Sequence, residues 1–311
     1  MMNKKIAVTG VTGKKSGRIF AEYLSDNKPP IDNLFEDGIN VLVRPSSNVS
    51  YIKELLPDAN ICTGDINDDA FLEKAFENVD TIVHIAGILF TEKIVNAAIT
   101  KKVRRLILVH TTGIYSKYKS AGENYRKIDE YTHRKCKENN IILTICRPTM
   151  IYGNIYDRNI VNFIKMVDKF PLMPVVNGAK YELQPVNYKD LGKAYFDILI
   201  NEETTANKDF NLSGEKPIQL RDILSKIGEK LGKKKVKFIS CPYFIAYAGA
   251  CALYGLSFGK YDYREKVQRL CEPRVYSHEE ATNTFGFSPI SFDVGIAEEV
   301  QEYINSKGNQ I

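Results

Sequence analysis

The chain has 311 residues and a formal net charge of +5, with 44% hydrophobic and 26% charged residues. This balance is typical of a globular protein with one large core or two smaller ones, and it excludes a fibrous or disordered chain. The basic clusters are short and alternate with acidic stretches, so nucleic-acid binding is not expected.

The chain opens with a strand, a glycine-rich turn and a helix. Residues 5–9 form a short apolar run, the turn contains Gly10, Gly13 and Gly17, and a helical pattern continues to Leu24. Glycines let the backbone approach a pyrophosphate, and a helix N-terminus offers free N–H groups and partial positive charge. This order of elements predicts a nucleotide-binding site.

Strands and helices alternate through the first half of the chain. Further strands are predicted over 39–43, 60–63, 81–85, 106–110 and 141–146, and helices over 16–25, 50–56, 69–77, 91–102 and 125–139. Short apolar runs separated by helices indicate parallel strands covered on both faces. We therefore expect an α/β fold with a doubly wound parallel sheet of the Rossmann type, whose ligand crevice lies outside the C-terminal strand ends.

The second half of the chain is less regular. A helix is predicted over 187–199, a strand over 209–213 and an amphipathic helix over 217–231. We expect a dinucleotide-binding domain over 1–180, to which the strand and helix around 184–214 return. A smaller α+β region over 215–311 would bind the substrate.

Residues 238–259 carry no charged side chain. This length would suffice to cross a bilayer, but Pro242 and several glycines interrupt the hydrophobic character. We expect a buried or substrate-lining helix. A helix in weak contact with a membrane surface and a true membrane span are the alternatives.

The six cysteines show no C-x-x-C spacing and no accompanying histidine cluster. No metal site is therefore expected, and the free thiols indicate a cytoplasmic protein. No charged-then-apolar leader precedes the first strand, so a signal peptide is not expected.

Five short motifs follow the predicted strands: TGVTG at 9–13, GDIND at 64–68, VHIAG at 83–87, TTGIY at 111–115 and RPTMIYG at 147–153. Together they resemble the extended and atypical short-chain dehydrogenase/reductase superfamily, of the NAD-dependent epimerase/dehydratase type. The resemblance continues through 184–190 and 210–214 to 285–292, so it covers nearly the whole chain.

The resemblance implies a set of dinucleotide contacts. Gly10, Gly13 and Gly17 would cradle the pyrophosphate, although Gly17 comes one residue later than in the G-x-x-G-x-x-G pattern of the superfamily. The remaining implied contacts are Thr12, Lys14, Lys15 and Ser16 in the longer loop, Asp65 and Ile66 beside the adenine, and Ala86, Gly87 and Pro148 at later strand ends.

Arg44 indicates which dinucleotide is bound. An NAD site needs a carboxylate near the end of the second strand, but this strand is followed by Arg44, Pro45, Ser46 and Ser47. A guanidinium with hydroxyls beside it suits a 2′-phosphate. We therefore expect NADP as the cofactor, with NAD as the alternative.

Catalysis in this superfamily uses a hydroxyl that holds the substrate oxygen, a tyrosine that exchanges its proton, and a lysine four residues later that lowers the tyrosine pKa. Thr111 matches the hydroxyl position, and Thr112 is the alternative. Tyr125 has Asp129 four residues later, so the expected spacing fails. Tyr125 and Lys127 stay the candidates for an irregular site.

A second tyrosine does have a lysine at the required distance. Tyr115 and Lys119 fit Y-x-x-x-K, but they lie directly after a strand. Tyr115 there matches a structural tyrosine of the superfamily, which favours coincidence.

Three functions stay open. The first is an NADP-dependent oxidoreductase or epimerase acting on a nucleotide sugar or a related alcohol, with a variant active site. The second is a non-catalytic dinucleotide-binding sensor or assembly protein, and the third is a reductase of an isoprenoid, steroid or lipid-linked substrate. A basic patch would favour the first, a missing tyrosine the second and an apolar cleft the third. Relatives pair through helices near 91–102 and 125–139, so a homodimer is expected as well.

Overall fold

A seven-stranded parallel sheet forms the body of the protein. The computed structural model describes residues 4–118, 120–233 and 235–308. The strand order is β11-β6-β5-β4-β1-β2-β3, and all neighbouring pairs are parallel. The strands are β1 (Ile6–Thr9), β2 (Ile39–Val43), β3 (Asn60–Thr63), β4 (Thr81–His84), β5 (Arg105–Val109), β6 (Ile142–Pro148) and β11 (Lys208–Leu212). The doubly wound α/β fold is thus confirmed. The strand order changes direction at β1, because β2 and β3 lie on one side of it and β4 lies on the other.

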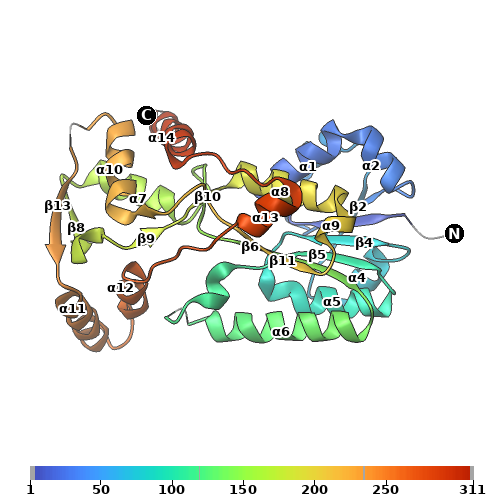
Figure 1. The fold of residues 1–311 in the computed structure, drawn as a ribbon, viewed down its shortest axis with the longest axis horizontal. Coiled ribbons are helices and arrows are strands. Elements are labelled where there is room, and N and C mark those ends of the chain that lie inside the picture. The colour runs from blue at the N-terminus through green and yellow to red at the C-terminus, as the bar shows by residue number, and fades with distance from the viewer. Residues whose placement is uncertain (1–3, 119, 234, 309–311) are drawn as a thin grey trace.

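Helices cover both faces of this sheet (Figure 1). One layer contains α1 (Ser16–Asp26), α2 (Lys28–Leu34), α3 (Ser50–Leu55) and α8 (Tyr188–Ile200). The other contains α4 (Asp69–Ala75), α5 (Thr91–Thr100) and α6 (Gly122–Glu138). Shorter elements of the body are the 3-10 turns η1 (Ile88–Phe90) and η2 (Thr112–Tyr115) and the helices α9 (Glu202–Thr205) and α13 (Glu279–Phe285).

Alternation along β1 shows why the strands read as continuous apolar runs. Ile6 and Val8 pack into the core under one helical layer, and Ala7 packs into the core under the other. All three side chains are fully buried. A strand covered on both faces buries every residue, so its sequence has no polar side.

A smaller lobe with its own core lies beside the carboxyl ends of the strands (Figure 1). Its helices are α7 (Ile160–Lys169), α10 (Leu220–Lys230), α11 (Tyr243–Leu256), α12 (Arg264–Leu270) and α14 (Phe292–Gly308). Its strands pair as β8 (Leu172–Val176) with β13 (Lys237–Cys241), β9 (Glu182–Leu183) with β12 (Ile218–Gln219), and β7 (Ile151–Tyr152) with β10 (Val186–Asn187). The turn η3 (Asn177–Ala179) follows β8. In α10, Leu220, Ile223, Leu224 and Ile227 are buried, which is the spacing of one helix face.

The expectation of one buried helix over 238–259 is wrong. The segment begins in β13, and α11 starts after Pro242. Ala250 alone of the α11 residues is buried. A helix with charged residues on one side shows in its sequence which side faces solvent. Because α11 has no charged residue, its sequence does not show which side, if any, is buried. Among the described residues, no helix is both long and apolar enough to cross a bilayer.

Candidate functional site

Two glycines shape the loop between β1 and α1. Gly10 has a φ of +81°, and a Cβ there would lie 2.7 Å from the backbone nitrogen of Ala86. A Cβ on Gly17 would lie 2.2 Å from the carbonyl oxygen of Gly10. Both positions therefore require glycine for the loop to pass close to β4 and for α1 to begin close to β1.

Gly13 differs from these two glycines because it faces open space. A Cβ there would meet no described atom closer than the Gly10 carbonyl oxygen at 3.9 Å. The first turn of α1 consists of Ser16, Gly17 and Arg18, and the described residues give its N-terminus no side-chain cap. An open, uncapped helix N-terminus beside glycines is a favourable place for a phosphate.

A cavity of about 440 Å³ lies above this loop. The implied dinucleotide contacts that line it are Gly10, Thr12, Gly13, Lys14, Lys15, Ser16, Gly17, Arg44, Ile66 and Ala86. The cavity has the size and location of a cofactor cleft at the point where the strand order reverses. Residues of this chain thus fit a dinucleotide by their shape as well as by their chemistry.

Among the described residues that line this cavity, three of the implied cofactor contacts are missing: Asp65, Gly87 and Pro148. The Asp65 carboxylate is engaged locally, accepting hydrogen bonds from the backbone and side chain of Asn67 at 2.9 and 3.0 Å. Gly87 has a φ of +114°, and its carbonyl oxygen lies 3.1 Å from His84 Nε2. Pro148 accepts a hydrogen bond at its carbonyl from the Thr112 hydroxyl at 3.1 Å.

The lobe holds the longer glycine-rich loop in place. Asn154 donates a side-chain hydrogen bond to the carbonyl of Lys14 at 2.7 Å. The Lys14 ammonium donates to the Tyr156 hydroxyl at 2.7 Å and lies 4.3 Å from the centre of its ring. The extra residue of the loop therefore has a structural partner in the segment that follows β7.

Arg44 follows β2 at the edge of the same cavity. Its side chain is exposed, and no ion pair of Arg44 occurs within the described part of the chain. Ser47 also lines this edge and lies 3.5 Å from the Thr12 hydroxyl. The guanidinium is therefore available to an anion at the end of β2.

The catalytic candidates do not come together. Thr111 and Thr112 line a second cavity, but neither cavity includes Tyr125 or Lys127 among its described lining residues. Tyr125 is half-buried on α6. Lys127 points to solvent, where its ammonium lies 2.7 Å from Glu123 and 69% of its side chain is exposed. Lys119, the partner considered for Tyr115, lies outside the described residues.

Asp129 occupies the position four residues after Tyr125 and is fixed by charged neighbours. Its carboxylate accepts two hydrogen bonds from Arg147 on β6, at 2.8 and 2.9 Å. His110 Nδ1 lies 2.8 Å away at the end of β5. Burial alone would raise the pKa of Asp129, but His110 and Arg147 hold that pKa below its usual value. Counted from Tyr125, the residue at the lysine position of Y-x-x-x-K is therefore a carboxylate that is already paired.

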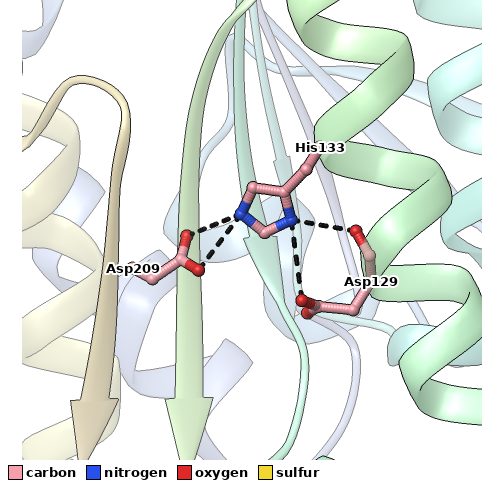
Figure 2. A group of neighbouring side chains, drawn as sticks. All are labelled: Asp129, His133 and Asp209. Atoms are coloured by element: carbon pink, nitrogen blue, oxygen red, sulfur yellow. Dashed lines mark hydrogen bonds and ion pairs between the residues drawn. The ribbon is translucent and has the colours of Figure 1, made fainter.

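His133 extends this network to β11 (Figure 2). Its Nδ1 lies 2.9 Å from the Asp129 backbone carbonyl, and its Nε2 lies 3.1 Å from the Asp209 carboxylate. Both ring nitrogens face acceptors, so both carry protons. The hydrogen bond to Asp209 raises the pKa of His133 to about 9.

The three side chains in Figure 2 also have the composition of a metal site, since their ligand atoms lie within 4.8 Å of one another. However, both carboxylates already pair with Arg147, which lies 2.8 Å from Asp209. With His133 protonated, two cationic groups balance the two carboxylates. The group is therefore an ion-pair network that joins α6, β6 and β11.

The second cavity has a volume of about 200 Å³ and is polar. Thr111, Thr112, Gln184, Arg269, Arg274 and Tyr276 are among its lining residues. Within the described chain, Nε of Arg269 and Nε of Arg274 are buried without a hydrogen-bond partner. Burial lowers the pKa of Arg274 to about 10, which leaves it charged at neutral pH. Two arginines in the wall of a polar cavity provide the positive charge that an anion would need.

Sequence reasoning missed these two arginines. They come from α12 and the segment after it, which contain no recognisable motif. They reach Thr111 only because the lobe folds against the strand ends. Nothing in the sequence around Arg269 and Arg274 distinguishes these two arginines from ordinary exposed basic residues.

A comparison of sequences finds that the NmrA-like family profile matches residues 2–248. No curated protein sequence matches the chain. Solved structures share the fold at low identity. One is PA4631, a nucleoside-diphosphate-sugar epimerase from Pseudomonas aeruginosa, with 17% identity and a TM-score of 0.72 over 97% of this chain and 98% of that one.

Two similar structures contain NAD. The dTDP-glucose 4,6-dehydratase DesIV from Streptomyces venezuelae has 17% identity and a TM-score of 0.71, and 98% of each chain is covered. The UDP-glucuronic acid 4-epimerase from Bacillus cereus, in complex with UDP-glucuronic acid and NAD, has 17% identity and a TM-score of 0.71 over 97% of this chain and 99% of that one. These likenesses show that the chain shares the fold of these epimerases and dehydratases.

Proposed function

The chain belongs to the NmrA-like family, and from this premise we propose that it is an NADP-dependent sensor that binds a small anionic ligand beside the dinucleotide. The observation that carries this proposal is that Asp129, and not a lysine, stands four residues after Tyr125 and is held in an ion pair with Arg147. Glycine geometry supports the dinucleotide, and the arginine cavity supports the anion.

NADP is favoured over NAD by Arg44. The guanidinium is exposed at the end of β2 and lines the larger cavity. A 2′-phosphate there would accept charge-assisted hydrogen bonds from Arg44 and a hydrogen bond from Ser47. The ribose of NAD would find no carboxylate in the segment 44–47.

A nucleotide sugar is the ligand class that we propose for the second cavity. Arg269 and Arg274 line this cavity and would attract a diphosphate through their positive charge, while Thr111 offers a hydroxyl to a sugar oxygen. Two of the similar structures are described as a nucleoside-diphosphate-sugar epimerase and a UDP-glucuronic acid complex. The polar wall does not favour the alternative of an isoprenoid or steroid substrate.

The proton chemistry of this site argues against hydride transfer through Tyr125. A bound nicotinamide would supply a hydride donor or acceptor, and a tyrosinate would have to exchange the proton of the substrate. The superfamily pattern supplies an ammonium beside such a tyrosine, but Lys127 points to solvent and the residue four positions after Tyr125 is Asp129. Asp129 cannot donate to the ribose either, since an ionised carboxylate only accepts hydrogen bonds.

The proposal is tested by calorimetry together with nicotinamide absorbance. We expect the chain to bind NADP more tightly than NAD, and to bind UDP-glucuronic acid when NADP is present. We expect no change in nicotinamide absorbance with UDP-glucose or UDP-glucuronic acid. Absence of dinucleotide binding would refute the proposal as a whole.

A second candidate, an NADP-dependent epimerase or reductase, is favoured by the presence of Thr111 in the same cavity as the arginines. Turnover that is lost in both Thr111→Val and Tyr125→Phe would establish this enzyme and overturn the sensor. Lys127→Gln is the matched control, because Lys127 is paired in solvent and should leave such turnover unchanged.

A further inference from the structure

Helix α11 exposes an apolar surface that the fold does not cover. Residues 238–259 contain no charged side chain, and Ala250 alone of the α11 residues is buried. Phe244 is 70% exposed and Leu256 is 82% exposed. The consecutive residues 251–254 are all exposed, so the end of this helix meets solvent on every side. A helix that is apolar on all sides is ordinarily found inside a protein core or a membrane.

Phe258 ends this helix in an unusual way. The N–H of Gly259 donates to the carbonyl of Tyr254 at 2.9 Å, and the N–H of Phe258 donates to that of Gly255 at 3.1 Å. These bonds form a Schellman motif, whose left-handed residue is generally glycine. Here that residue is Phe258, with a φ of +49° and a side chain that is 98% exposed. The motif therefore holds an aromatic ring away from the protein.

Aromatic residues lie within and beside the uncharged segment 238–259, and basic residues lie beside it in the sequence. Within 235–270 there are six basic and two acidic residues. Both acids are already paired, Asp262 with Arg264 at 2.7 Å and Glu265 with Arg269 at 3.8 Å. The tyrosines of this region are Tyr243, Tyr247, Tyr254, Tyr261 and Tyr263. Tyrosine and basic residues beside an apolar segment are typical of anchors at a membrane interface.

We propose that α11 and Phe258 insert into the surface of an anionic lipid bilayer. With 14 residues, α11 is about 21 Å long and cannot cross a hydrocarbon core of about 30 Å. It lies at the end of the lobe, away from the parallel sheet (Figure 1), where a flat surface can reach it. A second protein copy would cover one side of the helix, whereas lipid can surround all sides.

The test is flotation of the full chain with vesicles in a density gradient. The wild type is expected to float with vesicles of phosphatidylcholine and phosphatidylglycerol, and less with phosphatidylcholine alone. Phe244→Ser combined with Phe258→Ser should reduce the floating fraction at least about tenfold. Val294→Ser combined with Ile304→Ser is the matched control, since these α14 side chains are 55% and 41% exposed.

Charge is tested separately by Lys260→Gln combined with Lys266→Gln. This variant should lose the preference for phosphatidylglycerol and keep the residual binding to phosphatidylcholine. Circular dichroism and NADP binding show whether each variant is folded. Leu256→Ser replaces the phenylalanine variant if that variant is unfolded.

Two results would overturn the membrane assignment. One is a wild type that does not float, or that floats equally with and without the phenylalanines. The other is that neither protein floats, while the wild type is a dimer and the Phe244→Ser, Phe258→Ser variant is a monomer. The apolar surface of α11 would then be covered by a second copy of the chain and not by lipid. Neither result bears on NADP binding, so this inference and the proposed function fail independently.

Discussion

The Asp129 carboxylate on α6 accepts two hydrogen bonds from the Arg147 guanidinium on β6. The two residues are 18 positions apart in the sequence. Arg147 also lies 2.8 Å from Asp209, so a single buried cation serves two carboxylates. This relationship joins α6 and β11 to β6. It also explains why Asp129 is not available to act on a ligand.

Arg147→Leu should destabilise the fold strongly. The substitution leaves Asp129 and Asp209 half-buried with His110 and His133 as their main remaining partners. Removing one partner of a buried ion pair costs about 3–5 kcal/mol. Urea denaturation measures the loss. Arg134→Leu is the control because its ion pair with Glu138 is exposed, and an equal loss there would contradict the special role of Arg147.

His133 should make stability depend on pH in the alkaline range. Its pKa is raised from 6.5 to about 9 by Asp209, so its stabilising effect is complete below pH 6.5 and is lost as pH rises through about 9. The urea midpoint of the wild type should fall between these two values more than that of His133→Gln. The effect is reduced by solvent, since 43% of the His133 side chain is exposed.

His278 provides the comparison for this measurement. Burial lowers the pKa of His278, so His278→Gln should leave the alkaline loss in place. If His133→Gln and the wild type show parallel curves between pH 6.5 and 9, His133 is not protonated in the folded protein.

Two glycine variants separate folding from cofactor binding. Gly17→Ala would place a Cβ 2.2 Å from the Gly10 carbonyl, and we expect a loss of about 1–3 kcal/mol in stability. Gly13→Ala meets no such obstacle and should melt like the wild type. It should nevertheless bind NADP more weakly, because the methyl group would occupy space beside the helix N-terminus. Unchanged NADP affinity in Gly13→Ala would place the pyrophosphate elsewhere.

The central strands of the sheet were predictable from the sequence because each of them is a local apolar run. The run at 39–43 matches β2 and the run at 106–110 overlaps β5, both of which are buried, and the helical pattern at 125–139 overlaps α6. Buried parallel strands carry this signal without help from distant residues. Short lobe strands such as β7 and β9 have two residues each and give no periodic signal.

The site was less predictable for a different reason. The glycine loop is contiguous, so its residues could be assigned together. The network around Asp129 joins His110 after β5, Arg147 on β6 and Asp209 on β11, and these residues come together only when the strands assemble. Helix α11 is exposed because the rest of the lobe packs over very little of it, and the amino-acid composition of a helix does not show which elements will pack against it.

Arg44→Ala tests cofactor choice. The variant should bind NADP roughly ten- to hundredfold more weakly, because a charge-assisted hydrogen bond to phosphate is worth about 1.5–3 kcal/mol. NAD affinity should not change. Calorimetry measures both, and Lys53→Ala on the neighbouring helix α3 is the control. Equal losses for NADP and NAD would show that Arg44 does not recognise a 2′-phosphate.

Strand β11 pairs with β6 although residues 149–207 separate them. During synthesis, β6 therefore stays an open edge until residues 208–212 have left the ribosome. An unpaired edge is a template for pairing between different chains. A version of the chain that stops before residue 208 would keep this edge permanently. Such a fragment should aggregate even though its other six sheet strands are complete.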